Sequence, residues 1–81
     1  METLLDVTTV DVLPGYCLRL RFENGERRDF DMSPYLDKKP YQPLKDARRF
    51  ALASVGYGTV VWPGEIDMAP ETLYARSTPV R

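Results

Sequence analysis

Three carboxylates near the C-terminal end of the chain have the spacing needed for acid–base chemistry or cation binding. They are Glu65, Asp67 and Glu71. Paired carboxylates can act as general acid and base, and their oxygens are good ligands for hard cations. Asp67, however, lies three positions before Pro70, where a helix is expected to begin. We therefore interpret Asp67 as a cap that accepts backbone N–H bonds.

Nucleophilic and metal chemistry is disfavoured by what the composition lacks. The chain has no histidine and a single cysteine, Cys17. Without histidine, Cys17 and Ser33 lack the usual activating base, and the commonest metal ligand is missing. One cysteine cannot form an internal disulfide or a thiolate zinc cluster. We expect no catalytic residue, no metal site and no cofactor, hence a protein that is not an enzyme, with Cys17 packed on a sheet.

Basic residues gather between positions 38 and 49. They are Lys38, Lys39, Lys45, Arg48 and Arg49. With Tyr35 and Tyr41 nearby, such a cluster can bind phosphate groups or single-stranded nucleic acid. The formal net charge of -1, from 11 basic and 12 acidic residues, gives no long-range attraction to a polyanion. We prefer a solvated surface and keep a nucleic-acid accessory role for residues 38–49 as the alternative.

Three aromatic residues are candidates for partner binding. Trp62 follows Tyr57 and precedes Tyr74 in the C-terminal half of the chain. A tryptophan of this kind usually anchors a core, but a partly exposed one flanked by tyrosines can anchor a partner. We prefer the core role, and the exposure of Trp62 decides between the two.

Length and composition indicate a single domain, residues 1–81, with one small core. Apolar residues make up 43% of the chain, which is enough to fold and too much for a disordered protein. No segment approaches the roughly 20 apolar residues of a membrane span. The N-terminal sequence is not that of a signal peptide, and the cysteine content suits a reducing compartment. These features favour a cytoplasmic protein without a membrane partner.

The first strands are predicted from apolar alternation. Residues 4–12 form a strand whose apolar phase shifts, which indicates either a bulge near Thr8 and Thr9 or burial of both faces. After a turn at Pro14, residues 16–23 alternate clearly, and residues 27–32 return after a hairpin loop.

Two registers fit this hairpin. A loop of residues 23–25 pairs Arg19 with Asp29 but sets Arg21 opposite Arg27. Moving the loop by one residue pairs Arg21 with Asp29 instead. Turn chemistry favours the first register and cross-strand charge favours the second, and we prefer the first.

The hairpin is rich in arginine, namely Arg19, Arg21, Arg27 and Arg28. Most of these residues alternate outward against Glu23, Asp29 and Asp31. We interpret them as a charge network that keeps the sheet face soluble, with carboxylate binding as the alternative.

Short helices and a second hairpin follow. Ser33 and Pro34 predict a helix start, with Ser33 as its cap. Residues 43–50 predict a second helix that places Leu44, Ala47 and Phe50 on one face.

The last part of the chain is predicted from turn and helix signals. Residues 51–55 and 59–62 predict strands joined by a glycine-containing turn. Residues 63–69 are interpreted as a turn and a short acidic connector, Pro70 begins a helix that ends near residue 75, and residues 77–81 are expected to fray. The expected fold class is α+β: an antiparallel β-meander, short helices, a second β-hairpin and a C-terminal helix.

A family resemblance rests on Trp62-Pro63-Gly64, Asp67, Pro70-Glu71 and Leu73-Tyr74. The chain resembles a family of small bacterial domains of unknown function with the pattern W-P-x-G-x-D-x-x-P-E-x-L-Y. It departs from this pattern at one point, because Gly64 directly follows Pro63, where many members carry an extra residue. The resemblance implies a compact α+β fold and no established catalytic residue. It also implies relatives fused to a helix-turn-helix domain, and others encoded beside a small protein in an arrangement like that of toxin–antitoxin pairs.

These observations together favour a non-enzymatic regulatory or protein-interaction module. Missing acid–base chemistry argues against catalysis, and exposed edge strands offer a way to pair with a protein partner or with a second copy.

Overall fold

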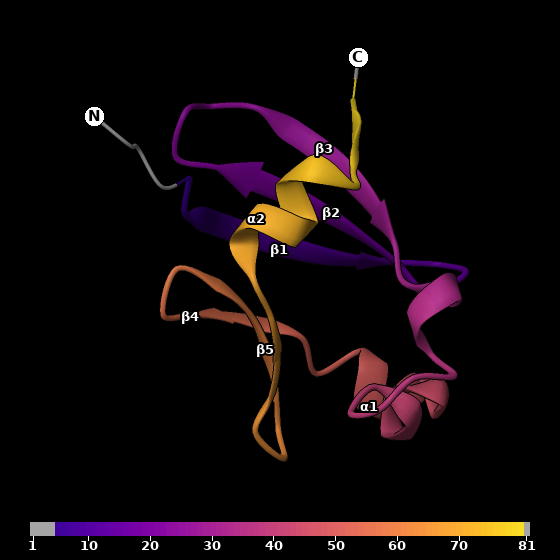
Figure 1. Cartoon of the computed structure of the whole chain (residues 1–81). Coiled ribbons are helices and arrows are strands. Elements are labelled where there is room, and N and C mark those ends of the chain that lie inside the picture. Colours follow the sequence, from indigo (N-terminus) through magenta and orange to yellow (C-terminus); the bar gives the residue numbers. More distant parts are fainter. Residues whose placement is uncertain (1–4, 81) are drawn as a thin grey trace.

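The computed structural model describes residues 5–80, which form two antiparallel sheets and several short helices (Figure 1). The strands are β1 (Val7–Leu13), β2 (Cys17–Phe22), β3 (Arg27–Asp31), β4 (Ser54–Gly56), β5 (Thr59–Trp62), β6 (Ile66–Met68) and β7 (Thr78–Pro79). The helices are the 3-10 turns η1 (Ser33–Tyr35) and η2 (Gln42–Lys45) and the α-helices α1 (Ala47–Phe50) and α2 (Pro70–Ala75). The predicted α+β class is confirmed.

The first sheet has the strand order β1-β2-β3-β7. Its central hairpin adopts the preferred register, with Arg19 opposite Asp29 and Arg21 opposite Arg27. A register shift between Val7 and Thr9 confirms the predicted bulge in β1. The bulge allows Val7 to be buried although the later residues of β1 continue in the other phase.

The second sheet has the order β4-β5-β6, and its third strand corrects the sequence interpretation. The segment expected to be an acidic connector is β6, in which Ile66 and Met68 are buried and Asp67 is exposed. This alternation is the strand period, because successive side chains point to opposite faces. The β4–β5 hairpin turns at Tyr57 and Gly58, whose φ angles are 54° and 77°, as a two-residue hairpin turn requires.

The helical region is more broken than expected. Residues 43–50 do not form one helix, because Asp46 is extended, with ψ at 114°, and separates η2 from α1. The Asp46 carboxylate accepts the N–H of Arg48 at 3.0 Å and so caps α1. Leu44 and Phe50 are buried as predicted, but Ala47 is exposed.

The expected cap at Ser33 is also wrong. Met32 precedes η1 without a side-chain cap, and Ser33 instead donates its N–H and hydroxyl to the Asp31 carboxylate, at 2.9 Å and 2.6 Å. The turn that leads into η1 is therefore held by Asp31, two positions before Ser33. Asp side chains commonly accept the backbone N–H two residues further along a turn.

The C-terminal segment is ordered where fraying was expected. Ser77 is buried, Thr78 pairs with Asp29 in the first sheet, and Val80 donates its N–H to Arg27 at 2.9 Å. Figure 1 shows this segment alongside β3 after α2 has crossed the first sheet. Arg81, the last residue of the predicted frayed end, lies outside the described residues.

The core draws on both sheets and on the helices. Its buried apolar residues are Val7, Leu18, Leu20, Phe22, Phe30, Met32, Leu36, Leu44, Phe50, Val60, Trp62, Ile66, Met68 and Leu73. Within residues 5–80, no helix has the length and apolar character needed to cross a membrane.

Candidate interaction site

Trp62 is a core residue, so its candidate role as a surface anchor is corrected. Its side chain is 3% exposed and its indole N–H donates to the Phe50 carbonyl at 3.0 Å. The two rings are stacked with centroids 6.0 Å apart. Trp62 therefore joins β5 to the end of α1, and so little of its surface is exposed that it cannot serve as a surface anchor.

The other two aromatic candidates have different surroundings. Tyr57 is fully exposed at the tip of the β4–β5 hairpin and stays a candidate contact residue. Tyr74 is half-buried, packs edge-on against Phe22 with centroids 5.1 Å apart, and donates its hydroxyl to Glu26. Tyr57 and Trp62 line one shallow hollow and Tyr74 does not, so the structure does not gather the three into one surface.

Tyr74 belongs to a network that ties the C-terminal segment to the first sheet. The Arg28 guanidinium lies 4.4 Å from the Tyr74 ring centroid. Its Nε and Nη2 donate to the hydroxyl and carbonyl of Ser77 at 2.7 Å and 2.9 Å, and its Nη1 donates to Glu26 at 3.0 Å. Arg28 thus points to the same side of the sheet as Phe30, and it is not part of the outward charge network predicted for the hairpin arginines.

Acid is expected to weaken the fold through carboxylates held in this way. The hydrogen bond from Tyr74 is the main reason that the pKa of Glu26 is below its ordinary 4.5, and the bond from Arg19 lowers the pKa of Asp29 below 3.8. Because each pKa is lower folded than unfolded, the stabilisation is complete above these values and is lost as pH falls through the folded ones. We therefore expect the urea concentration at the unfolding midpoint to decrease as the pH is lowered through this acidic range.

The control for this pH dependence is Glu26→Gln, which should make the urea midpoint less sensitive to acid than it is in the unsubstituted protein. Two results would contradict the assignment of this acid sensitivity to Glu26 and Asp29. One is a urea midpoint that stays constant from neutral pH to below 3.8. The other is a Glu26→Gln variant whose urea midpoint changes with pH as steeply as that of the unsubstituted protein.

The three carboxylates with suggestive spacing are not brought together. Glu65 and Asp67 line the hollow beside Tyr57, whereas Glu71 lines a different one near Tyr35. Asp67 is not a helix cap: α2 begins after Ala69 without a side-chain cap, and the Asp67 carbonyl accepts the Tyr41 hydroxyl at 3.0 Å.

The basic residues of positions 38–49 are all exposed, and several are engaged locally. Lys45 forms an ion pair with Asp37 at 2.7 Å, and the hydrogen bond from Lys45 lowers the pKa of that carboxyl. Lys38 lies 5.6 Å from the Tyr35 ring centroid, and Arg49 lies 4.0 Å from Asp46. Acidic and aromatic side chains thus lie among these basic residues, so the surface does not present a continuous positive patch.

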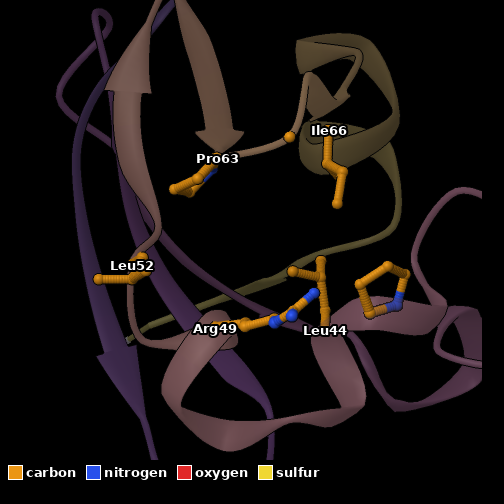
Figure 2. A pocket seen from close by; sticks show the side chains of 7 residues that line it. Leu44, Arg49, Leu52, Pro63 and Ile66 are labelled. Carbon is orange, nitrogen blue, oxygen red and sulfur yellow. The ribbon is translucent and has the colours of Figure 1, made fainter.

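An apolar groove next to α1 is a site that the sequence did not indicate. It has a volume of about 360 Å³. Its lining residues are Pro43, Leu44, Arg49, Leu52, Pro63, Gly64 and Ile66. Figure 2 shows Pro63 and Ile66 on one side and Leu44 with Arg49 on the other. Arg49 is the only charged residue of this lining.

Local structure explains how the groove stays open. The Pro63–Glu65 turn reverses the chain between β5 and β6 and holds Pro63 across from α1. Leu52 lies in the turn after α1 rather than in the predicted strand, and it is 57% exposed. The groove forms only where residues 43–52 and 63–66 lie next to each other in the fold. The periodic pattern of apolar residues in the sequence does not predict this contact. The sequence feature that could have pointed to the groove is the presence of Leu52 and Pro63 in turns.

Cys17 is half-buried at the start of β2, as expected of a packing residue. Burial, followed by the nearby charges of Asp31 and Asp29, raises the pKa of its thiol. A raised pKa leaves less thiolate, which is the reactive form.

Comparison with known proteins places this fold in a family. Neither the curated proteins nor the solved structures gave a match to the chain. The model of a family described as protein of unknown function (DUF2442) matches residues 7–79, which spans both sheets and all the helices. The chain therefore belongs to the DUF2442 family of proteins of unknown function.

Proposed function

We propose that this protein is a non-enzymatic regulatory module that binds a protein partner through the apolar groove beside α1. The observation that carries the proposal is Leu52, a large apolar residue that is 57% exposed on the wall of an apolar groove. Exposing such a side chain costs free energy that a partner would recover by covering it.

The distribution of exposed apolar residues supports this location. In the described part of the chain, the large apolar side chains that are exposed are Val12, Leu52, Val55 and Tyr57. Three of these four lie between residues 52 and 57, so the segment after α1 concentrates the apolar surface that is open to solvent.

The shape and charge of the groove specify what it would accept. A volume of about 360 Å³ is at the lower end of the range for ligand pockets, which is roughly 300–1,000 Å³. It suits one or two apolar side chains of a partner segment better than a large cofactor. Arg49 on the lining favours a carboxylate next to those side chains. The partner to test first is a small protein encoded beside this one.

Leu52→Asp is expected to weaken partner binding at least about tenfold, equivalent to 1.4 kcal/mol, because it places a charge on the apolar wall. Since Leu52 is exposed, the variant should stay folded. Binding is measured by calorimetry with the purified partner, after affinity purification of the tagged protein from its native host has identified it.

The matched control is Val12→Asp, which makes the same chemical change at an exposed valine of β1. Val12→Asp should bind as the unsubstituted protein does. Equal binding by the Leu52→Asp variant would overturn the groove as the site. If the protein is strictly monomeric and no partner co-purifies with it, the proposal of an interaction module loses its support.

The alternative, nucleic-acid binding by residues 38–49, gives a different result. Reversing the charges of Lys45, Arg48 and Arg49 would then abolish binding to a single-stranded oligonucleotide, and that binding would weaken steeply with salt. We expect no such binding, because this surface also carries Asp37 and Asp46.

A further inference from the structure

The outer face of the first sheet carries an uncompensated pair of positive charges. Arg21 of β2 and Arg27 of β3 lie directly opposite each other, and both are exposed. Directly opposed residues on one face have Cβ atoms about 4.5–5.5 Å apart, and like charges in this arrangement are destabilising.

Two carboxylates near the pair are occupied elsewhere. Asp29 accepts both the Nε and Nη2 of Arg19, at 2.9 Å and 3.0 Å. Glu23 accepts the N–H of Asp6 at 2.7 Å.

Of the remaining acidic neighbours, Asp11 lies opposite Arg19 across the β1–β2 pair and takes part in none of the ion pairs recorded within residues 5–80. Glu26 turns to the inner face and is used by Arg28, Asn24 and Tyr74. Among the ion pairs that the structure records within residues 5–80, neither Arg21 nor Arg27 has a carboxylate partner.

A hollow in the surface lies at this pair. It has a volume of about 320 Å³, and its lining residues are Thr9, Asp11, Arg19, Leu20, Arg21 and Arg27. Thr9 is the cross-strand partner of Arg21 in β1, so an exposed threonine, two guanidiniums and a depression meet at one point. The groove beside α1 shares no residue with this hollow.

We propose that Arg21 and Arg27 bind the dianion of a phosphate monoester. Each guanidinium presents a planar fork of donors that matches two phosphate oxygens. A phosphate monoester carries about −1.5 to −2 charges at neutral pH, which balances two arginines.

The surrounding charges favour a single phosphate group over a nucleic-acid strand. Asp29 and Asp31 follow Arg27 at alternate positions of β3 and therefore lie on the same face. Asp11 is opposite Arg19 and lies there too. Arg19 compensates the charge of Asp29, but Asp11 and Asp31 take part in none of the ion pairs recorded within residues 5–80. Their charges repel the further phosphates of an extended polyanion, whereas a monoester presents its charge at one point.

The test is a titration of the ¹⁵N-labelled protein followed by amide chemical shifts. The probes are a short phosphoserine peptide and inorganic phosphate. We expect saturable shifts at Thr9, Arg21 and Arg27, with affinity falling as pH drops below about 6, where the dianion becomes a monoanion. Tighter binding of the peptide would identify a phosphorylated side chain as the ligand. Equal binding would identify a small phosphate compound.

Two variants and one control make the result specific. Arg21→Gln and Arg27→Gln should each weaken binding about tenfold or more, while Arg48→Gln, an exposed arginine of α1, should leave it unchanged. Both variants should remain folded, because each removes one of two opposed like charges. Retained binding in both variants, equal shifts with the unphosphorylated peptide, or tighter binding of a single-stranded oligonucleotide would each overturn the proposal.

Discussion

Trp62→Ala is expected to destabilise the protein by about 3–5 kcal/mol, because it empties a large buried volume. The indole is 3% exposed, stacks on Phe50 and donates to the Phe50 carbonyl. At roughly 0.05–0.15 kcal/mol per residue, a domain of this size has only several kcal/mol of stability. Much of the Trp62→Ala protein should therefore be unfolded in dilute buffer, as measured by far-UV circular dichroism with urea titration.

Two further variants separate the contributions of the indole. Trp62→Phe retains an aromatic ring but leaves the buried Phe50 carbonyl without its donor, and should cost about 1–3 kcal/mol. Tyr57→Ala, at a fully exposed aromatic residue, should stay within about 0.5 kcal/mol of the unsubstituted protein. A Trp62→Ala variant that loses less than Tyr57→Ala would contradict the placement of Trp62 in the core.

Arg28→Ala is expected to cost about 2–3 kcal/mol and to release the C-terminal segment. The side chain of Arg28 is 13% exposed. Its loss removes donors to Ser77 and Glu26, and a hydrogen bond that involves a charged group is worth about 1.5–3 kcal/mol. Because Val80 pairs with Arg27 next to this network, amide exchange at Val80 should accelerate more than exchange at Leu20.

The controls for Arg28 use its own chemistry and its neighbours. Arg28→Lys keeps the charge but cannot reach Ser77 and Glu26 with a planar fork, so it should recover only part of the stability. Arg21→Ala, at an exposed arginine of the same hairpin, should have little effect or stabilise slightly, because Arg21 faces Arg27. Unchanged exchange at Val80 in Arg28→Ala would show that the network does not hold the segment.

Local signals were sufficient for the first hairpin and for α2. Gly25, with φ at 88°, takes the position that favours a glycine, and turn chemistry outweighed the unfavourable Arg21–Arg27 pair. The strand β6 was also within reach of the sequence, because Ile66 and Met68 flank an exposed Asp67 at the strand period. The adjoining turn and helix-start signals suggested a connector there instead.

Other features depend on tertiary contacts that have no local signal. The strand β7 is only two residues long and contains Pro79, so its pairing follows from the Arg28–Ser77 network rather than from strand propensity. The helical region is interrupted at Asp46 because its side chain accepts a backbone N–H and caps α1, which competes with continuing one helix through this residue. The groove needs Leu52 and Pro63 to lie on segments brought together by the core, which is why residue types alone suggested Trp62 instead.

The most direct test of the proposed function is amide chemical-shift mapping of the ¹⁵N-labelled protein with its purified partner. We expect the largest changes at Leu44, Arg49, Leu52 and Ile66, around the groove, and we expect them to disappear with Leu52→Asp. Changes centred on Lys38, Lys39 and Lys45, or changes that persist in Leu52→Asp, would contradict it.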